Sequence, residues 1–419
     1  MIRETQTEVL VVGAGPAGLM TALLLAEDGV DVRIIDQAWR TATHSYACVL
    51  HPATLKLLDR LGLAQDVIAQ GRRIDSIAFY EGTARRAELL LANLGGAFPF
   101  AVVLPQSAFE SLLEQRLLRH RQIKVEWNHR LAELINGDVN AVASVDRLGQ
   151  TAKGYIVPDW DWVVEETSRC RAAFVVGADG HNSLVRSKLG LEYESAGQPA
   201  SFVVFEFDTE TDPGSEMRVA LDNGSTNVLW PLPGRRARWS FQLVQSQPGQ
   251  EFPGKDREAV RIVQEAADRD TLRFMQRLAA ERAPWFKEPV KEVYWSIRIQ
   301  FQQRLARQFG QGRVWLVGDA AHQTGPVGVQ SMNAGLGEAA DLTAQLKNIL
   351  HARGSMDLLD RYQLQHRSLW QKQLGLTGGP VAQNGANAWV KDHWTKILPC
   401  LPACGADLTA LASQVGLGF

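Results

Sequence analysis

A glycine-rich turn near the N-terminus constrains the fold of this chain more than any other feature. Residues 13–18 read Gly-Ala-Gly-Pro-Ala-Gly, between the apolar run Val9–Val12 and the helix-forming segment Leu19–Glu27. A second apolar run, Val32–Asp36, follows. Strand, tight turn, helix and strand in this order make a βαβ unit, whose strands are parallel. The sequence therefore predicts an α/β fold built on a doubly wound parallel sheet.

The spacing of the three glycines is typical of a dinucleotide-binding turn. Gly13 would permit the sharp turn, Gly15 would let the backbone approach a pyrophosphate, and Gly18 would let the helix pack closely on the strand. The phosphates would then face the positive end of the helix. Asp36, at the end of the second strand, suits the hydroxyls of an adenosine ribose and disfavours a 2'-phosphate. The motif favours a bound dinucleotide over a purely structural turn, but by itself it does not separate FAD from NAD.

The rest of the chain alternates between helical and strand patterns. Residues 202–243 contain short apolar runs punctuated by Asp, Gly and Pro, which is typical of antiparallel strands. Further strands are predicted at Val293–Gln300 and Arg313–Val317. Because the parallel sheet begins at residue 9 and resumes near 313, we expect the β-rich region to be inserted into the first domain. Helices are predicted over His51–Leu61, Gln106–Arg119, Arg257–Ala280, Met332–Leu350 and Met356–Gln373.

Composition excludes several other classes of protein. The 44 basic and 46 acidic residues give a net charge of -2 with no basic stripe, so we expect no nucleic-acid partner. Four scattered cysteines, Cys48, Cys170, Cys400 and Cys404, do not form a disulfide framework or a zinc-binding spacing. We therefore expect no metal site and a reducing, cytoplasmic location. No run reaches the ~18 apolar residues of a membrane span.

Two later motifs indicate which dinucleotide is bound. The first is Asp179-Gly180, within 174–186, and the second is Gly318-Asp319, at the end of the predicted strand 313–317. A carboxylate at Asp319 could accept hydrogen bonds from the ribityl chain of a flavin. The small-residue loop Pro326–Ser331 would bring bare backbone close to a flat ring. A helix that begins near Met332 would aim free N–H groups at the ring, where reduced flavin carries negative charge.

These three motifs, in this order, resemble the class A flavoprotein monooxygenases, the 4-hydroxybenzoate hydroxylase-like family, over residues 9 to about 345. The resemblance implies FAD, with NADH or NADPH docking transiently as electron donor, because no second GxGxxG is present. It implies a discontinuous FAD-binding domain (1–75, 100–190 and 300–350), a β-rich α+β substrate domain (76–99 and 191–299) and a helical C-terminal region (351–419). The residues implied around FAD are Gly13, Gly15, Pro16, Ala17, Gly18, Asp36, Gln37, His44, Tyr46, Gln106, Leu131, Asp179, Asp319, Pro326, Gly328, Met332 and Asn333.

The chain departs from the family pattern at a few positions. His44 and Tyr46 stand where the family often has arginines that reach the pyrophosphate. Val329 and Ser331 replace glycines of the ring loop, and Glu338 stands where an aspartate is frequent. His322 is interpreted as a structural residue. No catalytic base is assigned, and the candidates near the reacting centre are Arg238 and Pro326, with Trp230, Arg238, Tyr294 and Arg298 as candidate pocket residues.

The resemblance implies a monooxygenase that hydroxylates a small aromatic or polycyclic substrate with O2, through a flavin C4a-hydroperoxide. The protein would exclude water and hold the target carbon within reach. A reductase, an epoxidase or an N-hydroxylase on the same fold remains an alternative, as does a flavin-holding sensor without turnover. The substrate and the choice between monomer and homodimer are left open by the sequence.

Overall fold

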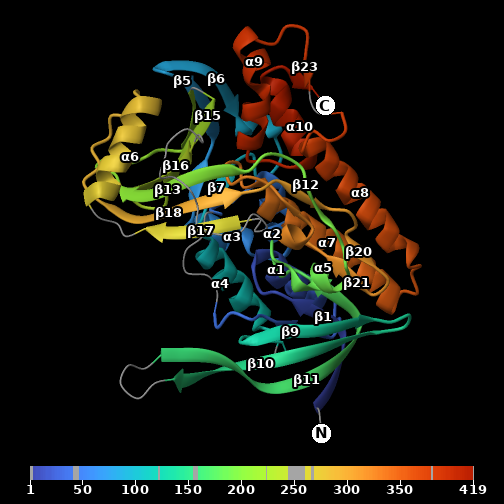
Figure 1. Ribbon diagram of the computed structural model, residues 1–419. Helices are drawn as coiled ribbons and strands as arrows, with labels where there is room; N and C mark the ends of the chain where they lie inside the picture. Colours follow the sequence, from blue (N-terminus) through green and yellow to red (C-terminus); the bar gives the residue numbers. More distant parts are fainter. Residues whose placement is uncertain are drawn as a thin grey trace.

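The computed structural model describes residues 3–40, 47–120, 123–153, 159–222, 224–243, 260–265, 269–378 and 381–418. Two large sheets organise this part of the chain (Figure 1). One carries the glycine-rich turn, and the other is the β-rich layer. The three C-terminal helices lie beside both, at the red end of the colour scale.

The first sheet has the strand order β20-β21-β11-β1-β2-β8. Its central pairings, from β21 through β11, β1 and β2 to β8, are all parallel, and β20 adds an antiparallel edge. The predicted doubly wound α/β fold is thereby confirmed. The strands are β1 (Arg3–Val12), β2 (Val32–Ile35), β8 (Val125–Glu126), β11 (Asp159–Gly177), β20 (Gly310–Gln311) and β21 (Val314–Leu316).

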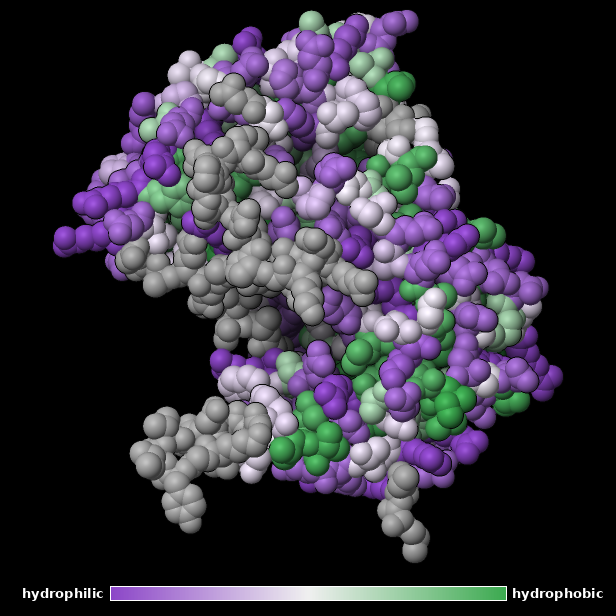
Figure 2. All heavy atoms as spheres, viewed as in Figure 1, coloured by the Kyte–Doolittle hydropathy of each residue, from purple (hydrophilic) through white to green (hydrophobic). Residues whose placement is uncertain are grey.

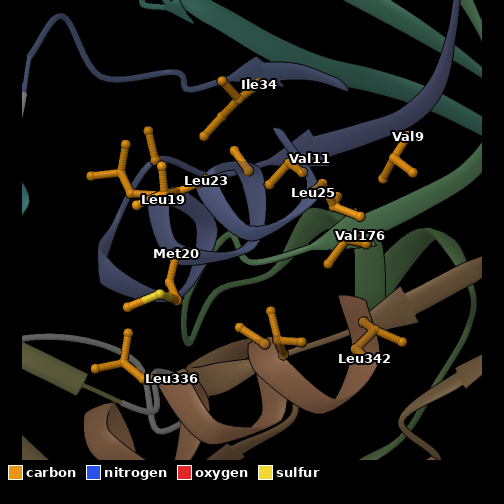
Figure 3. Close-up of a cluster of buried hydrophobic side chains, with 14 of the residues drawn as sticks. Val9, Val11, Leu19, Met20, Leu23, Leu25, Ile34, Val176, Leu336 and Leu342 are labelled. Carbon is orange, nitrogen blue, oxygen red and sulfur yellow. The ribbon is translucent and has the colours of Figure 1, made fainter. Parts of the chain in front are cut away.

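Helix α1 (Pro16–Glu27) lies between this sheet and α7 (Gln330–His351). Figure 3 shows Leu19, Met20 and Leu23 between side chains of the strands on one side and Leu336 of α7 on the other. A helix that is apolar around most of its circumference must be buried on several sides, and α1 has this composition. The packing therefore fixes the N-terminal ends of both α1 and α7 relative to the sheet.

A long antiparallel arm extends from the first sheet. Strands β9 (His129–Asn136) and β10 (Ala141–Lys153) pair with each other, and β10 continues along β11. On the face drawn in Figure 2, hydrophilic side chains predominate, and a small hydrophobic patch lies over this arm. Ile135 of β9 and Trp162 of β11 are exposed apolar residues of these strands.

The second sheet has eight strands in the order β17-β18-β13-β16-β15-β14-β5-β6. It is antiparallel except between β14 and β5, as the sequence predicts for its central part. Helix α6 (Arg269–Arg282) covers one face, and the other face packs on the ring loop and the C-terminal helices. The strands are β5 (Ser76–Glu81), β6 (Ala84–Leu90), β13 (Ala200–Asp208), β14 (Glu216–Asp222), β15 (Ser225–Leu232), β16 (Arg236–Leu243), β17 (Val260–Glu265) and β18 (Val293–Phe301).

The helix predicted over Arg257–Ala280 is wrong in its first part. Val260–Glu265 is strand β17, which pairs antiparallel with β18, and α6 begins only at Arg269. Pairing with a strand more than 30 residues away decides the conformation of such a short apolar run, and periodicity does not reveal it. Residues 257–259 and 266–268 of the prediction lie outside the described residues.

The other predicted helices are present. They are α2 (Pro52–Arg60), α4 (Gln106–Leu117), α7 and α8 (Asp357–Gln373), and the structure adds α3 (Ala64–Gln70), α5 (Leu184–Lys188), α9 (Ala388–Ile397) and α10 (Gly405–Gln414). Short strands complete the fold: β3 (Val49–Leu50), β4 (Arg72–Ile74), β7 (Ala101–Val103), β12 (Tyr193–Ser195), β19 (Arg304–Ala306), β22 (His322–Gln323), β23 (Val381–Ala382) and β24 (Leu417–Gly418). Across the described ranges, no helix combines the length and the apolar character that crossing a bilayer requires.

Candidate active site

Two connected chambers run along the carboxyl ends of the parallel strands. The nucleotide chamber has a volume of about 410 Å³, and the ring chamber has a volume of about 320 Å³. They share four residues, so they form one elongated cavity: Gly15, Gln106, Ala178 and Gly180. Of the residues that the sequence singles out, Gly13, Asp36, Gln37, Leu131 and Asp179 line the nucleotide chamber, and Pro16, Ala17, Asp319, Pro326 and Met332 line the ring chamber.

The glycine-rich turn has the geometry of a phosphate cradle. Gly13 has a φ of 104°, and a Cβ there would lie 2.3 Å from the Ala178 carbonyl oxygen. A Cβ on Gly18 would lie 1.9 Å from the Gly13 carbonyl oxygen, so only glycine allows α1 to pack this closely. A Cβ on Gly15 would meet nothing within 4 Å and would project into the space where the two chambers meet. The residues present therefore fit an extended dinucleotide such as FAD.

The Asp36 carboxylate is fixed by two backbone N–H groups. Its Oδ2 accepts a hydrogen bond from the Ala14 N–H at 2.6 Å, and its Oδ1 accepts one from the Ala38 N–H at 2.7 Å. The carboxylate thus joins the end of β2 to the glycine turn. Arg40 and Arg130 also line this chamber and bring positive charge to it. His44 and Tyr46, where the sequence departs from the family, lie outside the described residues.

Asp179 organises the turn before α5. Ser183 Oγ donates to its Oδ1 at 2.6 Å, and the Leu184 N–H donates to its Oδ2 at 2.7 Å. Burial raises the pKa of the Asp179 carboxyl, although these hydrogen bonds favour the ionised form. Arg186 then donates to the carbonyl oxygens of His181 and Ala320, both at 2.8 Å. This arginine holds the turn of Asp179 against the loop of Asp319.

A buried polar network connects Asp319 to the C-terminal helices. Ser331 Oγ donates to Asp319 Oδ1 at 2.6 Å and lies 3.3 Å from His322 Nδ1. His322 Nε2 lies 2.8 Å from the Glu338 carboxylate, which also accepts from Trp370 Nε1 at 2.8 Å. Burial opposes ionisation of Glu338, but the pairing with His322 holds its pKa below the ordinary value. His322 thus sits inside a structural network, and the unusual Ser331 supplies a donor to Asp319.

Hydrogen bonds hold the ring loop, Pro326–Ser331, on the side away from the ring chamber. Gln330 Nε2 donates to the carbonyl oxygens of Leu398 and Leu401, both at 3.0 Å. His51 Nε2 donates to the Gly328 carbonyl oxygen at 2.8 Å, since a carbonyl oxygen can only accept, and burial lowers the pKa of His51 to about 3, so the ring is neutral. Between these contacts Val329, the residue before α7, has a φ of 50°, a left-handed conformation that a β-branched residue rarely adopts.

Asn333 and Gly328 do not lie among the residues that line the ring chamber. Asn333 Nδ2 donates to the carbonyl oxygens of Val49 and Val329, and its Oδ1 accepts from the His51 N–H at 2.8 Å. A Cβ on Gly328 would lie 2.5 Å from the Pro399 carbonyl oxygen. The Asn333 side chain therefore supports the loop from the side away from the ring chamber, and the prediction that Asn333 and Gly328 contact FAD stays a prediction.

The four candidate pocket residues lie in the second sheet but not on the wall of the ring chamber. Arg238 is buried and paired with Glu206, and Trp230 belongs to the hydrophobic core beside it. Tyr294 is partly exposed, with Arg236 over its ring. Arg298 lies over the ring of Phe274 on α6, on the opposite face of the sheet, so placing it in the pocket was wrong. Strand alternation explains the position of Arg298, because its neighbours Ile297 and Ile299 point to the hydrophobic core on the other face of the sheet.

A third chamber adjoins the ring chamber at Thr324 and Gly325. Its volume is about 240 Å³. The second sheet supplies one wall with Phe202 and Phe301, and the end of α9 supplies another with Lys396. Its position beside the ring chamber gives a route by which a small molecule could reach the ring.

Sequence reasoning missed several residues of the site. Ala47 and Ile297 line the ring chamber, and Arg40 and Arg130 line the nucleotide chamber. Arg40 is close enough in sequence to Asp36 that its position after the second strand was a usable signal. Ala47 and Arg130 adjoin Tyr46 and Leu131, which the resemblance implied, whereas Ile297 comes from β18, a segment that only the folded second sheet brings to the cavity.

Comparisons with known proteins agree with this geometry. A family model described as "FAD binding domain" matches residues 6–374. The 6-methylpretetramide 4-monooxygenase of Streptomyces rimosus is 30% identical over 85% of this chain and 58% of its own length. The pentachlorophenol 4-monooxygenase of Sphingobium chlorophenolicum is 27% identical over 89% of this chain and 64% of its own length. The chain thus spans about three fifths of the length of these two relatives.

Solved structures share the fold. The p-nitrophenol 4-monooxygenase PnpA from Pseudomonas putida DLL-E4 superposes with a TM-score of 0.73 at 20% identity, covering 99% of this chain and 95% of its own. The flavin-dependent monooxygenase PieE, in complex with FAD and substrate, gives a TM-score of 0.70 at 20% identity, covering 88% of this chain and 62% of its own. Because the family model matches residues 6–374, which is most of the chain, this chain belongs to the FAD-binding-domain family.

Proposed function

We propose that the protein is an FAD-dependent monooxygenase that uses NAD(P)H and O2 to hydroxylate an aromatic or polycyclic substrate. The observation that carries this proposal is the continuous cavity from Asp36 past Gly15 to Pro326, with a further chamber adjoining its ring end. The named relatives act on aromatic compounds and support the same reaction class.

Each part of FAD has residues that suit its chemistry. Asp36 would accept from the adenosine ribose, and the turn at Gly15 would face the pyrophosphate. Gln106 and Asp319 would bind the ribityl chain, and the loop from Pro326 to Met332 would lie against the ring. Helix α7 has 22 residues, so its N-terminal end would favour the negative charge of the reduced ring.

FAD, when bound, would accept hydride from the nicotinamide and activate O2, which no side chain of this protein can do. The protein binds, orients and excludes water. Around the ring chamber, Ala47, Ile297 and Val329 supply apolar contacts. Such walls would keep water from the reacting centre and hold the aromatic carbon in place. Arg238 is paired with Glu206 and does not line the ring chamber. It would stabilise the second sheet, which forms part of this wall, and would not donate a proton to the substrate.

Other features of the proposal follow from the sequence. We expect the three domain ranges given above, a cytoplasmic location, and a monomer or homodimer. The second sheet, which joins β5 and β6 to β13–β18, supports the discontinuous substrate domain.

The decisive experiment for the reaction uses isotopically labelled O2. Purified FAD-loaded protein is supplied with NADH or NADPH and a library of phenols, naphthols and polycyclic phenols, and the products are analysed by mass spectrometry. One labelled oxygen atom in a hydroxylated product is expected. A product reduced without label would instead identify a reductase, and bound FAD with no oxidation of NAD(P)H above leakage would favour a sensor.

A further inference from the structure

The third chamber combines apolar walls with neutral polar groups. Phe202, Phe301 and Leu408 supply flat or branched apolar surface. Amide side chains from different segments also line it, among them Gln198, Gln303 and Gln373. An aromatic ring can pack on the first set while its oxygen substituents exchange hydrogen bonds with the second.

One lining residue carries charge. Lys396, on the last turn of α9, is the single ionisable side chain among the described residues that line this chamber. Its ammonium would lie 4.0 Å from a Cβ placed on Gly224, and Gly224 belongs to the facing wall. The ammonium therefore lies at the mouth of the chamber, between α9 and the exposed turn that contains Gly224.

The Lys396 ammonium forms no ion pair within the described ranges, and no carboxylate there lines the chamber. A half-buried cation without a counter-ion attracts an anion strongly, because the local dielectric is lower than that of water. A neutral phenol or an amine would leave this charge uncompensated.

We propose that Lys396 selects aromatic substrates that carry an anionic oxygen, and that it binds this oxygen in the third chamber while the ring to be hydroxylated reaches toward Thr324 and Gly325. This inference rests on the proposed monooxygenase function and adds the charge of the substrate to it. A carboxylate and an acidic phenolate or enolate both present the required oxygen.

Binding, measured by isothermal titration calorimetry on FAD-loaded protein at mildly alkaline pH, tests the proposal without turnover. The carboxylate arm compares 1-hydroxy-2-naphthoate with its methyl ester. The phenolate arm compares alizarin, which ionises readily, with its 2-O-methyl ether. In at least one arm, the anion should bind about tenfold more tightly than its neutral partner, as expected for a hydrogen bond to a charged group.

The variants locate the effect. Lys396→Gln should remove the preference for the anion and leave the affinity for the neutral partner unchanged, and Lys396→Arg should keep the preference. Lys391→Gln is the matched control, because Lys391 is exposed on the same helix and does not line the chamber. Higher salt should weaken the binding of the anion more than that of its partner.

Equal affinities in both arms for the wild type would overturn the proposal, as would an anion preference that survives Lys396→Gln. The proposed function is tested separately. Label from O2 in products of neutral phenols, with no preference for anions, would contradict the role of Lys396 and leave the proposed monooxygenase function standing. Selective anion binding with no oxygen incorporation would support the role of Lys396 and contradict the proposed monooxygenase function.

Discussion

Gly15 is the glycine of the turn beside which the cavity leaves room for a cofactor. The positions before and after it are closed by packing, since Gly13 and Gly18 lie against the backbone of Ala178 and Gly13, whereas the space beside Gly15 is empty of protein atoms. A side chain at this position would therefore compete with the ligand and not with the fold. Its backbone is extended, with a φ of -73°, so L-residues are tolerated there.

Gly15→Val is expected to weaken FAD binding by about tenfold or more while leaving the unfolding temperature of the cofactor-free protein unchanged. The physical reason is that the two methyl groups would occupy the junction of the two chambers. Fluorescence titration with FAD measures the affinity. Gly337→Ala is the control, because a Cβ at this α7 position also meets nothing within 4 Å but lies outside both chambers. Unchanged FAD affinity in Gly15→Val would contradict the assignment.

Glu338 makes stability depend on pH. Its pKa in the folded protein lies below the ordinary value of 4.5 because His322 pairs with the carboxylate despite complete burial. A lowered carboxyl pKa contributes stability that is present above about pH 4.5 and is lost as the pH falls through the folded pKa. The contribution therefore disappears in acid and not in base.

Glu338→Gln should lower the free energy of unfolding by about 3 kcal/mol near neutral pH, because the buried carboxylate accepts hydrogen bonds from the Gly318 N–H and from Trp370 Nε1 that a neutral amide replaces poorly. Chemical denaturation at several pH values should also show a smaller loss of stability in acid than in the wild type. Glu133→Gln serves as a control, because Glu133 is an exposed partner of Lys188. A variant whose stability falls in acid as steeply as the wild type would show that Glu338 is not the titrating group.

At the scale of elements, the C-terminal segment and the ring loop act as a clamp. Gln330 bonds to Leu398 and Leu401, and Gln373 Nε2 donates to Gln330 Oε1 at 2.7 Å. These bonds hold the loop while Val329 occupies its left-handed conformation. A strained residue persists only where its surroundings hold it, and strain of this kind costs about 1–3 kcal/mol.

Gln330→Ala is expected to destabilise the protein by about 2 kcal/mol, because two carbonyl oxygens lose their donor. It should also speed the release of FAD, since the loop would be free to leave its strained conformation. Thermal unfolding and a dilution assay of FAD release measure the two effects. Gln365→Ala, at an exposed position of α8, should change neither. Destabilisation without faster release would show that the clamp serves the fold alone.

The elements differ in how far the sequence could predict them. The βαβ unit was predictable because its motif is local: a strand, three glycines and a helix within 36 residues. Val260–Glu265 was not, because its pairing with β18 depends on residues far along the chain. The residues of the site were predictable or not for the same reason. Gly15, Asp36 and Asp319 carry local motifs, whereas the Arg186 bridge and the pair of His322 with Glu338 arise only when separate elements meet.

At the scale of the whole molecule, the cavity lies where the two sheets and the C-terminal helices come together (Figure 1). The parallel sheet supplies the nucleotide chamber, and the second sheet closes the ring chamber at Ile297. The C-terminal helices complete the third chamber. Because FAD and the substrate would occupy different chambers, substitutions at Lys396 should change which substrates bind without changing the affinity for FAD.

The central claim is that FAD occupies the cavity from Asp36 to Met332. The absorbance spectrum of gently purified protein, followed by quantification of the released flavin, tests it most directly. We predict the visible bands of an oxidised flavin and one FAD per chain, and full occupancy after incubation of any cofactor-free fraction with FAD. Colourless protein that takes up no added FAD would contradict the account.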